Sequence, residues 1–419
     1  MKVHVGDFIE IKKDGKIYRG ILMPHHAFSG KNIVVIKLEN GYNIGIKLTK
    51  DSKINVLKKR KQIKKIEEKI PYDEKKPTVA LIGTGGTIAS YVDYETGAVH
   101  PATTVEELAF AVPEIFEICN VEAKILFQKF SENIKPKDWQ RMAREVAKYL
   151  NKGKSGVIIA HGTDTMSYSA AALSFMLKNL NAPVVFVGSQ RSSDRPSSDA
   201  MLNLLSAAKV AISDIAEVVV VMHGSISDDF CYIHRGVKVR KMHSSRRDAF
   251  VSINSKPIGC INEKIEFYED YRKRNNGRVK VKAKLNENVA LIYYYPAMKR
   301  EDFEKIVENK DGIVIAATGL GHVGEEIIPA IKKLTRQGIP VVITTQCLWG
   351  RVNLNVYSTG RKLIKAGVIS GEDMLPEVAM IKLMWVLANE NDLEKAMLEN
   401  IAGEISFCNS SQYKACFIS

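Results

Sequence analysis

The sequence predicts an α/β fold, with two parallel-sheet α/β domains preceded by a small N-terminal β-barrel. Continuous apolar runs at 78–82, 156–160 and 183–187 have the length and composition of strands buried on both faces. A helical pattern over 199–212 and similar ones elsewhere separate such runs, which is the order expected of βαβ units and a parallel sheet. The first 50 residues differ, because short β-rich segments alternate there with turn dipeptides.

The barrel is predicted over residues 1–57. Four segments are rich in β-branched and aromatic residues: 8–11, 16–22, 33–38 and 42–48. Turn dipeptides separate them, at Asp14-Gly15, Ser29-Gly30 and Asn40-Gly41. Four or five strands in so short a stretch favour a small sheet that closes on itself and leaves no edge unpaired.

Positive charge is concentrated in the same part of the chain. Residues 1–77 contain 19 Lys and Arg against 9 Asp and Glu, which is +10 of the total net charge of +14. Residues 58–77, which are lysine-rich, are expected to be a basic linker. The charge predicts contact with a polyanion. A solvated linker joined to a small packing domain explains the same pattern, and the sequence leaves both interpretations open.

Composition places the chain among globular proteins of two or three domains, with 419 residues and 45% apolar content. Six scattered cysteines without a C-x-x-C pair favour reduced thiols, and therefore the cytoplasm. We expect no secretory signal at the N-terminus and no association with a membrane, since no apolar run approaches the length of a transmembrane helix.

Residues 78–262 are expected to form a large α/β domain, and residues 288–419 a smaller one. The smaller domain has apolar runs at 289–295, 312–317 and 339–344, with a helical pattern over 325–336. The segment 263–287 is charged and contains Asn275-Asn276-Gly277, so an interdomain linker is predicted there.

Two glycine-bearing turns follow two of the predicted strands and deliver threonines to their carboxyl ends. The turns are Thr84-Gly85-Gly86-Thr87-Ile88-Ala89-Ser90 and His161-Gly162-Thr163-Asp164-Thr165-Met166. Open α/β sheets bind ligands at this edge. The first turn fails the dinucleotide fingerprint, because Ile88 stands where the third glycine belongs, and the chain has no P-loop. His161 and Asp164 are possible metal ligands, but no second cluster has ligand spacing, so no metal is predicted.

The two turns resemble the signature segments of the L-asparaginase/glutaminase family, and the resemblance extends from about residue 76 to the C-terminus. It implies Thr87 as the nucleophile and Thr163 and Asp164 as its partners. The segment 239–245, before Ala249-Phe250, is similar to the family's lysine segment and implies Lys241. For substrate binding the resemblance implies these residues: Tyr94, Ser131, Glu132, Gly86 and Gly162.

Amide hydrolysis needs these residue types. A threonine hydroxyl is a poor nucleophile without an adjacent base. Lys241 is the expected base, with Thr163 relaying the proton and Asp164 orienting the lysine. Backbone N–H groups of the glycine turns are expected to stabilise the oxyanion. Without the family match, Lys241 is interpreted as a surface lysine in a basic stretch, and Ser131 and Glu132 as loop residues.

An asparaginase-like body behind a basic N-terminal β-domain resembles the D-subunit family of archaeal-type glutamyl-tRNA(Gln) amidotransferases. The resemblance implies that the chain releases ammonia from glutamine or asparagine for a partner subunit of the E type. That partner would use ATP and Mg to convert Glu-tRNA(Gln) to Gln-tRNA(Gln), while this chain binds no cofactor and self-associates as a dimer. The alternative is a free-standing L-asparaginase, which leaves the first 77 residues without a role.

Overall fold

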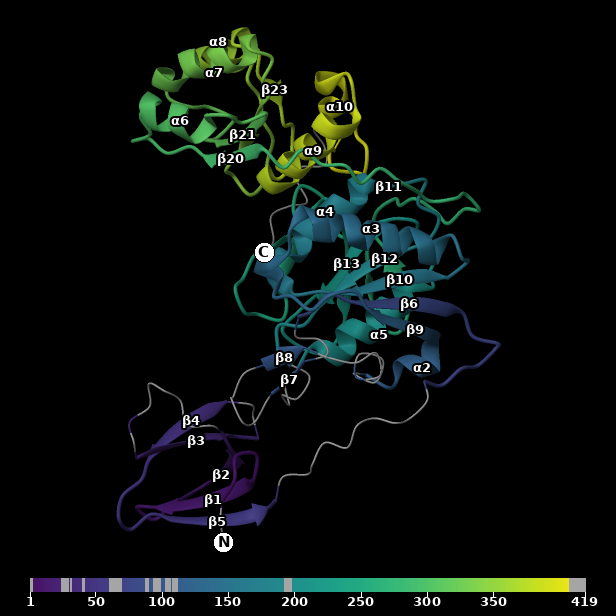
Figure 1. The fold of residues 1–419 in the computed structure, drawn as a ribbon, viewed down its shortest axis with the longest axis vertical. Coiled ribbons are helices and arrows are strands. Elements are labelled where there is room, and N and C mark those ends of the chain that lie inside the picture. Colours follow the sequence, from purple (N-terminus) through teal and green to yellow (C-terminus); the bar gives the residue numbers. More distant parts are fainter. Residues whose placement is uncertain are drawn as a thin grey trace.

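The computed structural model describes residues 3–23, 30, 32–39, 42–59, 70–86, 90–92, 99–101, 107, 112–191 and 198–406 of the 419-residue chain. Three parts follow one another along the longest axis of the molecule (Figure 1). An N-terminal sheet lies at one end, a large α/β domain in the middle and a smaller α/β domain at the other end (Figure 1).

The N-terminal part is a five-stranded antiparallel sheet with the order β4-β3-β2-β1-β5. Its strands are β1 (Phe8–Lys13), β2 (Lys16–Leu22), β3 (Ile33–Lys37), β4 (Asn43–Lys47) and β5 (Lys53–Lys58). Alternate residues point inward, which buries Ile9, Ile11, Ile36 and Ile46 in one small core. The pairings of the described residues do not join β4 to β5. This part is therefore an antiparallel sheet, and its closure into a barrel stays a prediction.

The large domain is built on an eight-stranded sheet with the order β18-β17-β14-β13-β12-β10-β6-β9. Its strands are β6 (Thr78–Gly83), β9 (Asn120–Ile125), β10 (Gly156–Ala160), β12 (Val184–Val187), β13 (Val218–His223), β14 (Cys231–Arg235), β17 (Gly259–Ile261) and β18 (Ile265–Phe267). Strands β6, β9, β10, β12 and β13 run parallel to one another, as expected of a parallel sheet. Strands β14, β17 and β18 run antiparallel, so the sheet is mixed rather than parallel throughout. The connection over 224–230 is too short for the crossover that a parallel β14 needs.

Helices cover both faces of this sheet. The helices α3 (Pro136–Leu150) and α4 (Met166–Met176) pack on one face, and α2 (Ile115–Ile118) and α5 (Ala200–Ala211) on the other. Every residue of β10, β12 and β13 is buried, because both faces of these strands are covered. This burial explains why their sequences are continuously apolar rather than alternating.

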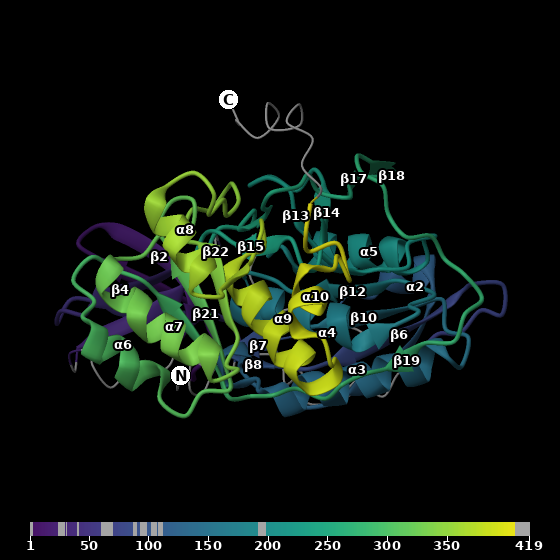
Figure 2. The same ribbon diagram turned by 90° about the horizontal axis from the view of Figure 1, so that it is seen from above.

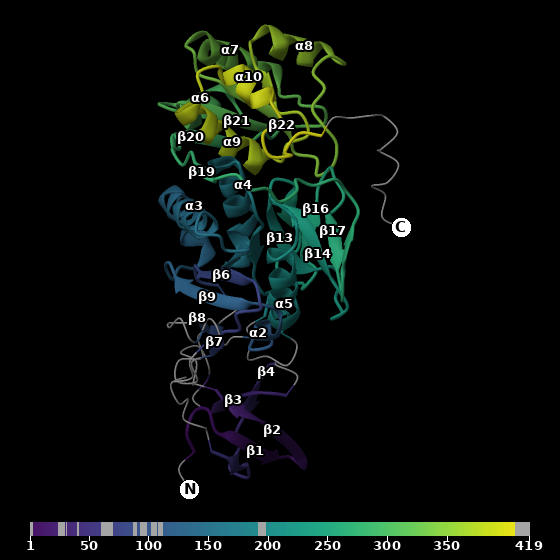
Figure 3. The same ribbon diagram turned by 90° about the vertical axis from the view of Figure 1, so that its right-hand side faces the viewer.

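The smaller domain has a four-stranded parallel sheet, β20-β21-β22-β23, as predicted. Its strands are β20 (Val289–Tyr293), β21 (Gly312–Ala317), β22 (Val341–Thr345) and β23 (Ile369–Ser370). Its helices are α6 (Arg300–Val307), α7 (Ile328–Arg336), α8 (Ser358–Lys365), α9 (Pro376–Asn389) and α10 (Leu393–Leu398), and the short turn η3 (Glu325–Ile327) precedes α7. In Figures 1 and 3, α9 lies where the two α/β domains meet, and in Figure 2, seen from above, it lies over α4. Its Trp385 ring stacks on Phe175 of α4, 6.5 Å between centroids, so the two domains share one apolar core.

Three short ladders complete the described structure. These are β7 (Ser90–Val92) with β8 (Val99–Pro101), β11 (Leu177–Lys178) with β19 (Lys280–Val281), and β15 (Val239–Lys241) with β16 (Phe250–Ser252). The segment expected to be an interdomain linker, 263–287, contains β18 and β19 and pairs with the large domain at both.

No helix in the described part of the chain is both long and apolar enough to cross a lipid bilayer. The cysteines of the described ranges, Cys119, Cys231, Cys260 and Cys347, are free thiols.

Candidate active site

The two glycine turns leave neighbouring strands at one edge of the sheet. Strands β6 and β10 are paired in parallel, from Val79 opposite Gly156 to Gly83 opposite Ala160. The chain leaves β6 for β9 on one side and then returns to β10 on the other, so the strand order reverses between β6 and β10. Such a reversal opens a crevice at the carboxyl ends of the two strands. Both predicted signature segments begin at this crevice.

A glycine allows the first turn to lie directly against the second. Gly86 has φ +91°, and a Cβ added there would lie 2.6 Å from the backbone nitrogen of Gly162. Only glycine permits this conformation and this approach together. Thr84 is fully buried, and its hydroxyl donates a hydrogen bond to the carbonyl of Ala160 at 2.9 Å, so this threonine joins the strands. Thr87, which follows Gly86, and Tyr94 lie outside the described residues.

The second turn is held by a buried histidine. His161 Nδ1 lies 2.7 Å from the carbonyl oxygen of Gly162, which can only accept, so Nδ1 carries the ring proton. Nε2 then accepts from the hydroxyl of Ser169, which in turn accepts from the indole N–H of Trp139. Burial lowers the pKa of His161 to about 4, so the ring is neutral at neutral pH.

This network also bears on the metal alternative. Both ring nitrogens of His161 are engaged in protein hydrogen bonds. No group of three or more His, Cys, Asp and Glu side chains in the described ranges is placed to hold a metal ion.

Lys241 reaches the second turn from β15. Its Nζ lies 2.9 Å from the hydroxyl oxygen of Thr163 and 2.7 Å from a carboxylate oxygen of Asp164. The Lys241 side chain is 11% exposed, whereas that of Asp164 is 68% exposed. The structure thus joins three of the four predicted catalytic side chains in one cluster, although 77 positions separate Asp164 from Lys241. A solvated surface lysine does not fit this geometry.

The predicted substrate-binding residues of the short turn η1 (Ser131–Asn133) lie beside this cluster. Ser131 is buried, and its carbonyl accepts a hydrogen bond from the Thr165 hydroxyl at 2.7 Å. A Cβ added to Gly162 would lie 2.8 Å from Cβ of Ser131, so the two residues are in contact. Glu132 is exposed next to Ser131. Gly86, Gly162 and Ser131 therefore pack against one another at the carboxyl ends of β6 and β10, with the lysine cluster beside them.

Two charged residues at β15 were missed at the sequence level. Arg240 of the strand binds Glu377 through two hydrogen bonds, of 2.8 and 2.6 Å, and Lys238, just before the strand, binds Asp373 at 2.7 Å. The spacing Lys238-x-Arg240 is the one signal that points to them, because alternate residues of an extended segment share a face.

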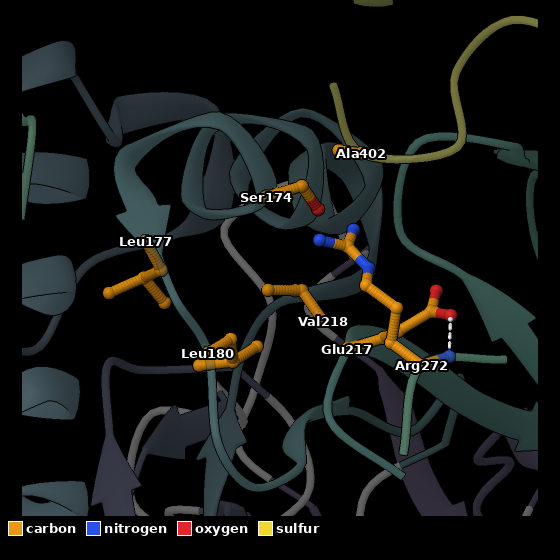
Figure 4. Close-up of a pocket in the computed structure, with 7 residues that line it drawn as sticks. All are labelled: Ser174, Leu177, Leu180, Glu217, Val218, Arg272 and Ala402. Carbon is orange, nitrogen blue, oxygen red and sulfur yellow. Dashed lines mark hydrogen bonds between the residues drawn. The ribbon is translucent and has the colours of Figure 1, made fainter. Parts of the chain in front are cut away.

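A separate small cavity lies at the opposite edge of the sheet, beside the first residue of β13 (Figure 4). It holds about 10 Å³, room for about one water molecule. Its polar lining is formed by Ser174, Glu217 and Arg272, and the carboxylate of Glu217 accepts from the backbone N–H of Arg272 at 2.8 Å (Figure 4). The cavity lies away from the glycine turns and is too small for an amino acid.

Comparison with known families covers nearly the whole chain. Residues 78–273 match the family model "Asparaginase, N-terminal", and residues 288–397 match "Glutaminase/Asparaginase C-terminal domain". Residues 3–57 match "GatD N-terminal domain". The D subunit of a glutamyl-tRNA(Gln) amidotransferase from Pyrococcus furiosus is 58% identical and aligns over 96% of this chain and 95% of its own length. The chain belongs to the D-subunit family of glutamyl-tRNA(Gln) amidotransferases. A second D subunit, from Thermococcus kodakarensis, is 54% identical, with 96% of this chain and 94% of its own length aligned.

Solved structures of L-asparaginases resemble this D-subunit family chain over its α/β domains. The thermostable L-asparaginase from Thermococcus kodakarensis has a TM-score of 0.71 and 33% identity. L-asparaginase I from Vibrio cholerae has a TM-score of 0.70 and 30% identity. Each aligns over 79% of this chain and 100% of its own. About a fifth of this chain thus aligns with neither enzyme.

Proposed function

We propose that this chain is the ammonia-releasing subunit of a glutamyl-tRNA(Gln) amidotransferase. One observation carries the proposal. A lysine, a threonine and a carboxylate of the asparaginase type meet at 2.7–2.9 Å in a chain that aligns almost end to end with amidotransferase D subunits. The cluster supports amide hydrolysis, and the alignment supports its use in an assembly.

Thr87 is the proposed nucleophile, and it attacks the side-chain amide carbon of glutamine or asparagine. Thr163 passes the proton of Thr87 to Lys241. In the structure Lys241 Nζ donates to both Thr163 and Asp164. Once deprotonated, Lys241 can keep the bond to Asp164 and accept the Thr163 proton on its lone pair. The proton then goes to the departing ammonia, and water hydrolyses the acyl ester.

The crevice supplies the remaining proposed groups. Backbone N–H groups around Gly86 and Gly162 stabilise the oxyanion that forms on the amide oxygen. Ser131 and Glu132 hold the amino and carboxylate ends of the substrate, and Tyr94 covers it. Support comes from the packing of Gly86, Gly162 and Ser131 against one another.

The rest of the assembly is also proposed. An E-type partner subunit uses ATP and Mg to activate Glu-tRNA(Gln), and receives the ammonia in the cytoplasm. Two copies of this chain form a dimer at its centre. The basic N-terminal region, residues 1–77, contacts the polyanion of the reaction, the tRNA, since it carries +10 of the +14 net charge.

A free-standing L-asparaginase is the second candidate, because L-asparaginase structures align over 100% of their length with this chain. The two candidates differ in the expected activity of the isolated chain. We expect slow ammonia release from glutamine and asparagine by the chain alone, and fast release when the partner subunit, Glu-tRNA(Gln) and ATP are added. Fast asparagine hydrolysis by the chain alone, unchanged by these additions, would favour the asparaginase.

A further inference from the structure

The segment that carries Lys241 makes side-chain contacts on both of its faces. Around β15 alternate side chains point in opposite directions, so Lys241 and Val239 face the large domain while Arg240 and Lys238 face away from it. Lys241 reaches Thr163 and Asp164 on one side. On the other side, Arg240 and Lys238 reach Glu377 and Asp373 of the smaller domain.

The contacts to the smaller domain are buried ion pairs. The Lys238 and Asp373 side chains are both 2% exposed, and Glu377 is 4% exposed. Arg240 holds Glu377 with two parallel N–H···O bonds, the geometry that best fixes orientation. Burial alone would lower the pKa of Arg240, but the hydrogen bonds and charge of Glu377 outweigh it and raise that pKa. The guanidinium is therefore a permanent charge facing a fixed carboxylate.

The two carboxylates of the smaller domain, Glu377 and Asp373, are themselves held in place. Glu377 lies in the first turn of α9, a helix whose Trp385 packs in the core that both domains share. A carboxylate at the start of a helix is also stabilised by the helix dipole. The other Asp373 oxygen accepts the backbone N–H of Ser406 at 2.9 Å, which fixes that carboxylate in turn.

Strand β15 has few backbone pairings of its own to hold it in place. Among the described pairings, β15 pairs with β16 alone and lies outside the eight-stranded sheet. A two-stranded ladder is marginally stable by itself. Catalytic groups must be held within about 0.5 Å of their productive positions. Core packing of Val239 and Phe250 holds the face of the ladder that carries Lys241. On the other face, the side-chain contacts with the smaller domain are what can hold the backbone beside Lys241 in place.

We propose that Arg240 and Glu377 are positioning residues for Lys241. Their ion pair fastens β15 to α9, and so keeps the lysine nitrogen within reach of Thr163. Through this ion pair the smaller domain takes part in amide hydrolysis. This inference rests on the proposed function, because it assumes that Lys241 is the base.

The chain offers a closely matched control pair. Arg235 of β14 binds Glu217 with Nε–Oε2 2.7 Å and Nη2–Oε1 3.2 Å, and their side chains are 17% and 4% exposed. The corresponding values for Arg240 and Glu377 are 21% and 4%. Both pairs are bidentate and buried, but Arg235 lies on β14 of the main sheet, six positions before Lys241, whereas Arg240 is directly adjacent to it.

The test compares Arg240→Gln and Glu377→Gln with Arg235→Gln and Glu217→Gln in the full-length chain together with its partner. Ammonia release is measured per mole of folded protein, and thermal unfolding is recorded for each variant. We expect kcat to fall about tenfold in the first two variants with KM changed less than about twofold, since a displaced base slows chemistry more than binding. The two control variants lose thermal stability but keep kcat within about twofold.

Arg240→Lys supplies a second measurement, because it keeps the charge and loses the two-pronged geometry. Its kcat is expected between those of the wild type and Arg240→Gln. The proposal is overturned if the Arg240 and Arg235 variants lose kcat equally, or if the Arg240 variants keep full kcat. A wild-type chain that releases no ammonia with its partner present would instead overturn the proposed function.

Discussion

The N-terminal sheet and the large α/β domain are both built on β-strands, yet they bury their residues differently. In the sheet, four isoleucines form the buried core, and β1, β2, β4 and β5 each include exposed residues. In the large domain, β10, β12 and β13 are buried along their whole length. The sheet and the linker after it carry most of the net charge, whereas the large domain holds the lysine cluster. We infer that the chain separates recognition from chemistry, and each prediction below tests that separation.

Loss of the lysine cluster should have the largest effect. Lys241→Ala removes the proposed base, and Thr163→Val removes the proton relay while keeping the shape of the side chain. We expect ammonia release to fall by about 10²–10⁴-fold in either variant, the usual contribution of a general base. Binding of tRNA by the complex should stay unchanged, as measured by fluorescence anisotropy. Lys256→Ala, at an exposed position in the same domain, serves as the control and should keep full activity.

Deletion of residues 1–70 should weaken tRNA binding and leave ammonia release nearly unchanged. The cut keeps the hydrogen bonds between Asp73 and Asn120, of 2.8 and 2.7 Å, that attach the following segment to the large domain. We expect the truncated chain to release ammonia at nearly the rate of the intact chain. The affinity of the complex for tRNA should fall about tenfold or more, because phosphate contacts dominate such binding. Equal loss of both activities would mean that the two regions are not separate.

Acid should destabilise the α/β part selectively. Burial lowers the pKa of His161 to about 4 and that of His234 to about 3, against 6.5 for the free side chain. The unfolded chain therefore takes up protons below about pH 6.5 that the folded chain refuses. The stability that the two neutral rings contribute is fully present above that pH. It is lost as the pH falls toward their pKa values in the folded chain, by about 2 kcal/mol per histidine at pH 5.

The histidine effect is measured as the pH dependence of unfolding in urea. His234→Leu should remove about half of the loss between pH 7 and 5, since one of the two buried rings is gone. The deletion of residues 1–70 should leave the loss unchanged, because both rings lie in the large domain. A loss that survives His234→Leu in full would assign the acid sensitivity to other groups.

Single lysines of the N-terminal sheet should have the smallest effect. Lys12 and Lys53 lie opposite each other on β1 and β5, at the surface of the sheet. Each change to Gln should lower the slope of log affinity for tRNA against log salt by about 0.7–0.9 if that lysine contacts one phosphate. The exposed Lys332 and Lys333 of α7 are the control pair, and their replacement should leave the slope unchanged.

Much of this arrangement could be predicted from local sequence. The apolar runs identified β6, β10, β12, β20, β21 and β22, because strands covered on both faces have no polar side to present. They did not identify β9, β14, β17, β18 or β23. The order of the glycine turns predicted that Thr163 and Asp164 lie at the crevice, since the carboxyl ends of adjacent parallel strands share one edge. The family resemblance added Lys241, and the structure places it against both residues.

The rest depends on contacts between distant parts of the chain. Glu377 lies 137 positions after Arg240, and nothing near either residue marks the other. The direction of the antiparallel strands β14 and β18 follows from the short connections that precede them rather than from the residues of the strands. Closure of the N-terminal sheet and the roles of Thr87 and Tyr94 stay predictions.

The central claim is that the large domain supplies nitrogen to a transfer that takes place elsewhere. The most direct test gives the complex glutamine labelled with heavy nitrogen in its side-chain amide, with Glu-tRNA(Gln) and ATP, and measures the label in the glutamine released from tRNA. We predict that the label appears with the wild-type chain and not with Lys241→Ala, whereas free ammonia restores unlabelled product in that variant. Label that still reaches tRNA in Lys241→Ala, or never reaches it with the wild type, would contradict the account.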